Sequence, residues 1–224
     1  MMASPRDEVF TTVAVMNGEI EFLDLHLERL NEHANRLDIE INVPNFQNFE
    51  DGLVRIAFSG NWNYEHRSFP MYKPKIRAIY AKAPEFEDSV MGTKHGHWQP
   101  YHEAKIQANA QGADISLLVK DELVIDADRA SPILLDAQGI AWASDEKNGS
   151  VRSVTFEALI GLFTQNGIPI QFGNITKKMI EKCQELIVVG TGMRVAMISH
   201  IHTQKIGNGT HRMLKMCQKF LEVR

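Results

Sequence analysis

The chain has 224 residues, of which 44% are hydrophobic, so it can bury a core in one large domain or two small ones. Its 24 basic and 28 acidic residues give a net charge of −4, which excludes the strong positive charge typical of nucleic-acid-binding proteins. Cys183 and Cys217 lack the spacing of a disulfide framework or zinc site, which indicates reduced thiols in a cytoplasmic protein. No apolar run reaches membrane-spanning length, and residues 1–8 lack a signal-peptide core.

In the first third of the chain, the sequence predicts two strands, then two helices, and then a further strand. β-Branched residues over 9–15 predict a strand, and Asn17-Gly18 predicts a tight turn into a return strand at 20–22. Apolar residues at helical spacing then predict an amphipathic helix through Leu23, Leu27, Leu30, Ala34 and Leu37. The elements expected next are a helix at 46–58, a loop at 60–70 and a strand at 75–82.

The polar, irregular stretch 84–93 predicts a linker between a small N-terminal domain, residues 1–83, and a larger C-terminal domain, residues 94–224. The elements expected in the larger domain are a helix at 101–111 ended by Gly112, strands at 115–120, 123–127, 133–136 and 140–143, a helix at 154–165 ended by Gly167, a short helix capped by Thr176, strands at 186–189 and 194–200, and a helix at 210–221. This order favours an α+β fold of two domains with a cleft between them.

One segment is far more specific than these patterns. Residues 94–114, KHGHWQPYHEAKIQANAQGAD, resemble the class IV aminotransferase pattern of a lysine, two residues, Asn-Tyr, and a helix ending in Ala-Gly-Ala-Asp. The resemblance implies the fold-type IV architecture, a small α/β domain plus a larger mixed-sheet domain, with pyridoxal 5′-phosphate in the interdomain cleft. It also implies that Lys94 is the catalytic lysine that carries the cofactor, since a desolvated amine near another cation is nucleophilic. In isolation Lys94 would be read as a solvated lysine at the start of a strand.

Further matches extend the resemblance over roughly residues 7–209. In the helix His-Leu-Glu-Arg-Leu at 26–30, the resemblance implies that Arg29 holds the cofactor phosphate. Arg29 lies at the edge of the apolar face, where an arginine needs an anionic partner. A surface ion pair with a nearby acid is the alternative for this residue.

An acidic residue is expected at the pyridine nitrogen, where a negative charge keeps the ring protonated and able to accept electrons. The segment 124–131, VIDADRAS, falls where the family has Thr-Glu-Gly-Ser-x-x-Asn, so Asp126 is the candidate, one methylene shorter than the family's glutamate. Asp128 is the competing assignment if the register shifts by two residues.

The resemblance implies two more phosphate-binding segments. The segment 148–155, NGSVRSVT, opens a helix whose N-terminus suits an anion, with the Val154 amide and Thr155 as donors. The turn 189–193, VGTGM, resembles the family's Gly-Thr-Ala turn, so Thr191 would bind the phosphate and Gly192 the substrate carboxylate.

The chain departs from the family pattern at several positions. His97 and Trp98 stand where the family has asparagine and tyrosine, and both are expected to contact substrate. Phe156 replaces an arginine, and the family's opening strand and loop have no counterpart here. We therefore expect one wall of the site to be missing or supplied by the partner in the homodimer that the resemblance implies.

Three functions remain open on the sequence. The first is an aminotransferase that passes an amino group from an amino acid to a 2-oxo acid. The second is a 4-amino-4-deoxychorismate lyase that releases 4-aminobenzoate and pyruvate, and the third is a non-catalytic protein that binds the cofactor or a phosphate. The histidine pairs His95/His97 and His200/His202 could face one side of a strand, but no acid or cysteine completes a metal-binding spacing, so we expect no metal. We expect no nucleic-acid or membrane partner.

Overall fold

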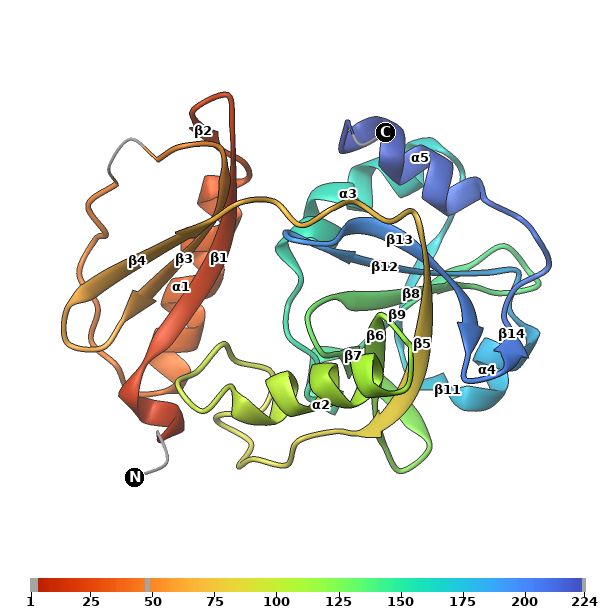
Figure 1. Cartoon of the computed structure of the whole chain (residues 1–224), viewed down its shortest axis with the longest axis horizontal. Coiled ribbons are helices and arrows are strands. Elements are labelled where there is room, and N and C mark those ends of the chain that lie inside the picture. The colour runs from red at the N-terminus through yellow and green to blue at the C-terminus, as the bar shows by residue number, and fades with distance from the viewer. Residues whose placement is uncertain (1–3, 47–48, 223–224) are drawn as a thin grey trace.

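The computed structural model describes residues 4–46 and 49–222. A short 3-10 helix at Pro5–Asp7 precedes an antiparallel sheet with the order β2-β1-β3-β4, in which β1 spans Val9–Met16, β2 Glu19–Ile20, β3 Gly52–Phe58 and β4 Trp62–Arg67. Helix α1 (Leu23–Arg36) covers one face of this small sheet (Figure 1). Because side chains alternate along a strand, the odd residues of β1 face α1 and its even residues face away.

The second sheet is larger and mixed. Its strands follow the order β10-β9-β8-β12-β13-β5-β6-β7-β11, and β14 pairs with β13. The strands are β5 (Lys75–Lys82), β6 (Ile115–Lys120), β7 (Leu123–Ala127), β8 (Ser131–Leu135), β9 (Ala141–Ser144), β10 (Ile170–Gly173), β11 (Ile175–Thr176), β12 (Glu185–Gly190), β13 (Arg194–Ile201) and β14 (Gln204–Lys205). β5 is parallel to both β6 and β13, and β10 to β9, whereas the other pairs are antiparallel.

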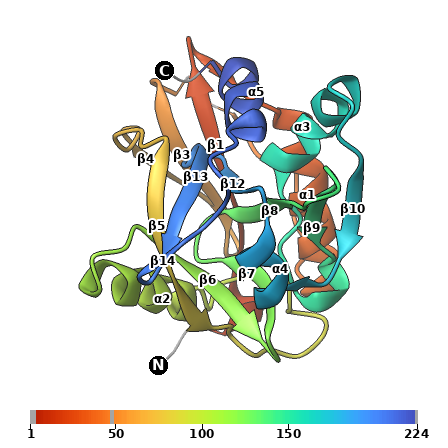
Figure 2. The same ribbon diagram turned by 90° about the vertical axis from the view of Figure 1, so that its right-hand side faces the viewer.

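Helices pack around the large sheet and complete its core. They are α2 (Gln99–Ala110), α3 (Val154–Gln165), α4 (Lys177–Lys182) and α5 (Arg212–Phe220), with a 3-10 turn at Glu146–Asn148. Figure 2 shows α5 and α2 toward opposite ends of the molecule. One apolar cluster joins α3 and α5 to the sheet through Leu159, Phe163 and Met213. None of the helices in the described ranges is long and apolar enough to cross a membrane.

Ion pairs and hydrogen bonds tie the two sheets together. Arg152, just before α3, pairs with Glu28 and Glu32 of α1 at 3.0 and 3.2 Å. Arg194 at the start of β13 pairs with Glu21 of the small sheet's hairpin. The Tyr72 hydroxyl, on the segment between the sheets, donates to the Val195 carbonyl at 2.9 Å. The relative position of the sheets is therefore held at several points.

Most predicted elements are confirmed. The α+β class and the mixed sheet are as expected, and α3 spans the predicted residues 154–165. Asn17 and Gly18 have φ of 54° and 78°, as a tight hairpin turn requires. Thr176 caps α4 by accepting from the Met179 amide, and Gly112 after α2 has φ of 68°.

Two predictions in the first third are wrong. The helix expected at 46–58, of which residues 47–48 lie outside the described ranges, is replaced by β3, and the loop expected at 60–70 contains β4. Phe46, Phe49, Leu53 and Ile56 fit helical spacing, but the run Gly52–Phe58 pairs along its whole length with β1. Strand pairing with a buried neighbour therefore outweighs a weak periodic pattern.

The change of sheet also occurs earlier than the expected domain boundary. β4 ends the small sheet at Arg67 and β5 already belongs to the large sheet, so the chain crosses over residues 68–74 and not after residue 83. The segment 84–93, expected as a linker, leaves the large sheet after β5 and returns to it through α2.

The buried carboxylate of Glu185 caps α5 from the neighbouring strand β12. It accepts hydrogen bonds from the Met213 and Leu214 amides at 2.8 and 2.9 Å, and its side chain is nearly inaccessible to solvent. Glu185→Leu should lower the free energy of unfolding by about 1–3 kcal/mol, because two buried amides lose their acceptor. Urea denaturation measures this. The exposed Glu181→Leu variant is the control, and an equal loss in both would contradict the capping role.

Candidate active site

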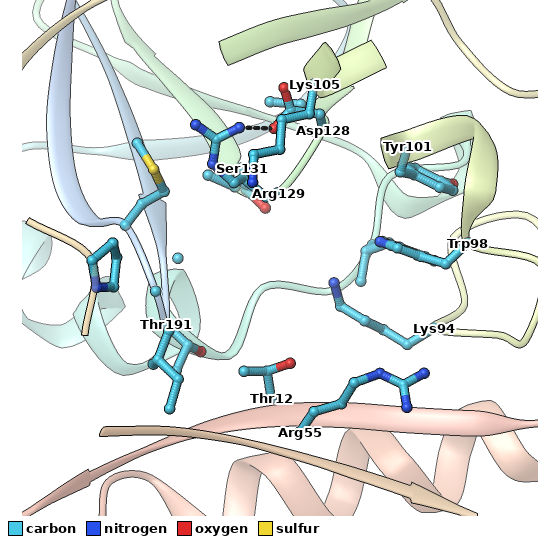
Figure 3. A pocket seen from close by; sticks show the side chains of 18 of the residues that line it. Thr12, Arg55, Lys94, Trp98, Tyr101, Lys105, Asp128, Arg129, Ser131 and Thr191 are labelled. Atoms are coloured by element: carbon cyan, nitrogen blue, oxygen red, sulfur yellow. Dashed lines mark hydrogen bonds and ion pairs between the residues drawn. The ribbon is translucent and has the colours of Figure 1, made fainter. Parts of the chain in front are cut away.

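A cleft of about 1390 Å³ lies between the two sheets. The small sheet contributes Phe10, Thr12 and Arg55 to one wall, and the opposite walls come from the segment after Thr93, the end of β7, the start of α3 and the β12–β13 turn (Figure 3). All nine site residues expected from the sequence line this cleft, namely Arg29, Lys94, His97, Trp98, Asp126, Val154, Thr155, Thr191 and Gly192. The fold thus gathers residues that are far apart in the chain.

Lys94 extends its amine into the cleft (Figure 3). Its Nζ lies 4.4 Å from the centroid of the Trp98 ring and 5.6 Å from that of Phe10, so it rests against aromatic faces. Trp98 is in turn stacked on Tyr101, with centroids 3.8 Å apart. Desolvation, followed by the positive charge of Arg29, holds the pKa of Lys94 well below the usual lysine range. A larger fraction of this amine is therefore neutral and nucleophilic near pH 7.

Arg29 is a buried cation without a carboxylate partner. It is 5% exposed, and its Nη2 donates to Thr11 Oγ1 at 2.7 Å while its Nη1 donates to the Arg152 carbonyl at 3.0 Å. Within residues 4–46 and 49–222 it makes no ion pair, and its buried Nε has no hydrogen-bond partner. Burial lowers its pKa to about 10, so the charge persists at neutral pH. A buried unpaired charge is costly, which indicates that an anion completes this site.

The start of α3 lies beside the Arg29 guanidinium. Ser153 caps the helix by accepting from the Phe156 amide at 3.3 Å, and the buried residues Val154 and Thr155 form its first turn. The first amides of a helix have no acceptor within the helix and point toward anions at its N-terminus. Together with the Arg29 contact to the Arg152 carbonyl, this places a guanidinium and free helix amides around one location.

The turn after β12 lines the cleft with two glycines, Gly190 and Gly192, on either side of Thr191. A side chain at Gly190 would lie 3.2 Å from the Arg129 carbonyl oxygen, and one at Gly192 would lie 3.0 Å from Leu53 Cδ1. Glycine at both positions therefore allows the turn to approach its neighbours closely. Thr191 lies between them with its side chain at the cleft (Figure 3).

The two candidate carboxylates have different surroundings. Asp126 is buried and accepts hydrogen bonds from the Val151 and Ala127 amides at 3.0 and 2.9 Å. Burial raises the pKa of Asp126, and the charge of Lys94 acts in the opposite direction. Asp128 is already bonded to Arg129 Nη1 at 2.6 Å and to the Ser116 amide at 2.7 Å (Figure 3). Within residues 4–46 and 49–222 Asp126 makes no ion pair, so it is better placed to receive a positively charged ligand atom.

Sequence reasoning missed several residues that contact the site. His26 and His33 are buried on α1, and their spacing of three and four residues from Arg29 is a visible signal of a shared helix face. Arg55, 4.2 Å above the Phe10 ring and paired with Glu8, was hidden because its strand was predicted as a helix.

The histidine pairs also separate in the structure. His97 lines the cleft, whereas His95 is buried between Phe86 and Trp98, where desolvation lowers its pKa to about 4. In the described part of the chain no group of three or more histidine, cysteine or acidic side chains is arranged to hold a metal ion.

Comparison with known proteins reveals a family. The sequence model described as amino-transferase class IV matches residues 56–201. D-alanine aminotransferase of Listeria monocytogenes is 25% identical over 121 residues, 53% of this chain but only 42% of that enzyme. A Methanocaldococcus jannaschii protein named as a branched-chain-amino-acid aminotransferase is 21% identical over 251 residues, covering 97% of this chain and 87% of that protein.

Solved structures share the fold. One is a protein of Legionella pneumophila named as a 4-amino-4-deoxychorismate lyase, with a TM-score of 0.85, 18% identity, and 96% of this chain and 90% of that chain covered. Another is the branched-chain amino acid aminotransferase of Escherichia coli, with a TM-score of 0.84, 12% identity, and 97% and 85% covered. At these identities the likeness establishes the fold-type IV architecture.

The charges around Lys94 predict how its reactivity depends on pH. Arg29 lowers the pKa of Lys94 and Asp126 raises it, so Arg29→Gln should move the midpoint of amine labelling to higher pH and Asp126→Asn to lower pH. The measurement is the rate of Lys94 modification by trinitrobenzenesulfonate, read by peptide mass spectrometry, with the exposed Lys182 as the internal reference. A midpoint unchanged in both variants would contradict the charge assignment.

Proposed function

The chain belongs to the class IV aminotransferase family, and from this we propose that it uses pyridoxal 5′-phosphate to transfer an amino group between an amino acid and a 2-oxo acid. The observation that carries the proposal is the Lys94 amine, which faces the cleft beside aromatic rings with a lowered pKa. When bound, the cofactor supplies an electron sink for the substrate's α-carbon.

The residues present fit that cofactor at both of its ends. The unpaired Arg29, the Val154 and Thr155 amides at the start of α3, and the Thr191 hydroxyl would hold the phosphate, since each offers a hydrogen-bond donor to an anion. Asp126 would pair with the pyridine nitrogen. Two backbone amides already fix its carboxylate, which limits its freedom to turn away.

Lys94 has two tasks in this scheme. Its neutral amine would hold the cofactor, and its Nζ would take up the substrate's α-proton and return it, as a general base of moderate pKa can. The Trp98 and Phe10 rings confine the amine to the cleft and exclude water from one side of it.

The substrate is a small amino acid or aminated carboxylate. The Gly192 amide, His97 and Trp98 would contact it, and nine basic against six acidic residues line the described cleft although the chain carries net charge −4. This local excess of positive charge favours anionic ligands. We place the protein in the cytoplasm as a homodimer.

A lyase that converts 4-amino-4-deoxychorismate to 4-aminobenzoate and pyruvate is the second candidate. The likeness to the Legionella protein of that name favours it, as does the resemblance of Phe10-Thr11-Thr12 and Lys94-His95 to the lyase branch of the family. The Gly190-Thr191-Gly192 turn is more similar to the aminotransferase branch. Turnover assays with amino acids and 2-oxo acids, beside one with aminodeoxychorismate, separate the two. A bound cofactor without either activity would favour a non-catalytic binding protein.

The covalent attachment of the cofactor to Lys94 can be tested directly. Incubation with pyridoxal 5′-phosphate should give a visible absorbance band that borohydride fixes to the Lys94 peptide, and Lys94→Ala should lack the band. Lys105→Ala removes another lysine of the same cleft and should retain it. Absence of the band in the wild type, or its fixation at a different lysine, would refute the proposal.

The second prediction concerns the phosphate. Arg29→Gln should reduce the preference for pyridoxal 5′-phosphate over pyridoxal by roughly 10- to 100-fold, because hydrogen bonds to a charged group contribute about 1.5–3 kcal/mol. Competition binding with both compounds gives this ratio. Equal loss of affinity for both forms would show that Arg29 supports the fold and not the phosphate.

A further inference from the structure

Helix α1 presents buried polar side chains to the site along one face. His26, Arg29 and His33 are separated by three and four residues, so they lie one above the other, and each is at most 5% exposed. Buried polar side chains are costly unless each has a specific partner. One turn beyond His33, Arg36 donates to the Asp88 and Met91 carbonyls and so docks the segment before Lys94 onto the same helix.

His33 contacts the backbone of the lysine itself. The Lys94 amide donates to His33 Nδ1 at 3.0 Å. Because a backbone N–H only donates, Nδ1 must be unprotonated and the ring carries its hydrogen on Nε2. Burial and the nearby charges of Arg29 and Lys94 hold the pKa of His33 below its usual range, which keeps this acceptor available.

The other side of the Lys94 peptide is also held by the small sheet. The Phe10 amide of β1 donates to the Lys94 carbonyl at 3.2 Å. Lys94 lies in an irregular segment without a ladder of its own, so these two hydrogen bonds fix where its side chain begins.

His26 contacts Arg29 indirectly, through the hydroxyl of Thr11. Arg29 Nη2 donates to Thr11 Oγ1 at 2.7 Å, and Thr11 Oγ1 lies 2.8 Å from His26 Nδ1. Since the guanidinium can only donate, the Thr11 hydroxyl hydrogen is free to be given to His26. Helix α1 thus carries the guanidinium at Arg29 and holds the lysine backbone through His33, four residues later.

We propose that His33 is a positioning residue: through the Lys94 amide it sets the distance between the lysine's amine and the Arg29 anion site, with α1 as the rigid spacer. Four residues of α-helix advance about 6 Å along the axis. The inference rests on the proposed function for the identity of the reaction, whereas the contact between His33 and Lys94 stands on its own.

The test compares His33→Leu, His33→Asn and Leu37→Ala. Leucine fills the space of His33 but offers no hydrogen-bond acceptor. The side-chain oxygen of asparagine lies where Nδ1 was and restores the acceptor for the Lys94 amide. Leu37 is fully buried under the same helix but lies outside the cleft, so Leu37→Ala reports the effect of lost stability alone. Thermal unfolding of each variant shows how far its stability has fallen.

Two readouts are followed in each variant. One is the pH midpoint of Lys94 labelling in the cofactor-free protein, and the other is the rate of the absorbance change with pyridoxal 5′-phosphate. We expect His33→Leu to raise the labelling midpoint, because an amine displaced from Arg29 loses part of the charge effect that lowers its pKa. The same variant should slow adduct formation roughly 10- to 100-fold, because small misplacements of a reacting group cost rate steeply. His33→Asn should restore most of both, and Leu37→Ala should move neither.

The inference fails if His33→Leu matches the wild type, or if Leu37→Ala shifts both readouts as much as His33→Leu does. If the wild type forms no adduct, the proposed function fails, and the labelling midpoint still decides the role of His33.

Discussion

The buried guanidinium of Arg29 is the constraint on which the site depends. It is charged at neutral pH and buried, and in the described part of the chain it donates to one hydroxyl and one carbonyl. A neutral hydroxyl and carbonyl do not replace the hydration of a cation, so an anion that bound at this position would also stabilise the folded chain. The start of α3 and the Gly190–Gly192 turn line the same cleft as this guanidinium.

The two sheets divide the chemistry between them. The small sheet and α1 carry Arg29 and hold the backbone of Lys94, whereas the large sheet supplies Asp126, the α3 amides and Thr191. Neither the small-sheet part nor the large sheet contains all of these residues. The ion pairs of Arg152 and Arg194 across the boundary therefore fix the separation of groups that line one cleft.

The residues predicted for the site line one cleft, whereas the prediction of the small sheet is partly wrong. Lys94 and its partners follow a spaced pattern of chemically distinctive residues, and all of them line one cleft. β3 was misread because its apolar residues fit both periods, and only pairing with β1 decides between them. The role of His33 was also missed, because its partner is a backbone amide 61 residues away, and a sequence pattern carries no record of such a contact.

The position of β5 in the large sheet has a consequence for biogenesis. β5 lies between β6, which follows soon after it, and β13, whose Met197 is opposite Lys75. One flank of β5 therefore stays open until the ribosome has delivered β13, more than 100 residues later, and parallel pairing over such a separation is slow. The Gly190–Gly192 turn leads directly into β13, so this wall of the cleft is synthesised after the other segments that line it. If cofactor is present in the cell at that moment, it would bind a pocket that is still forming. Its negative charge would help to stabilise that pocket.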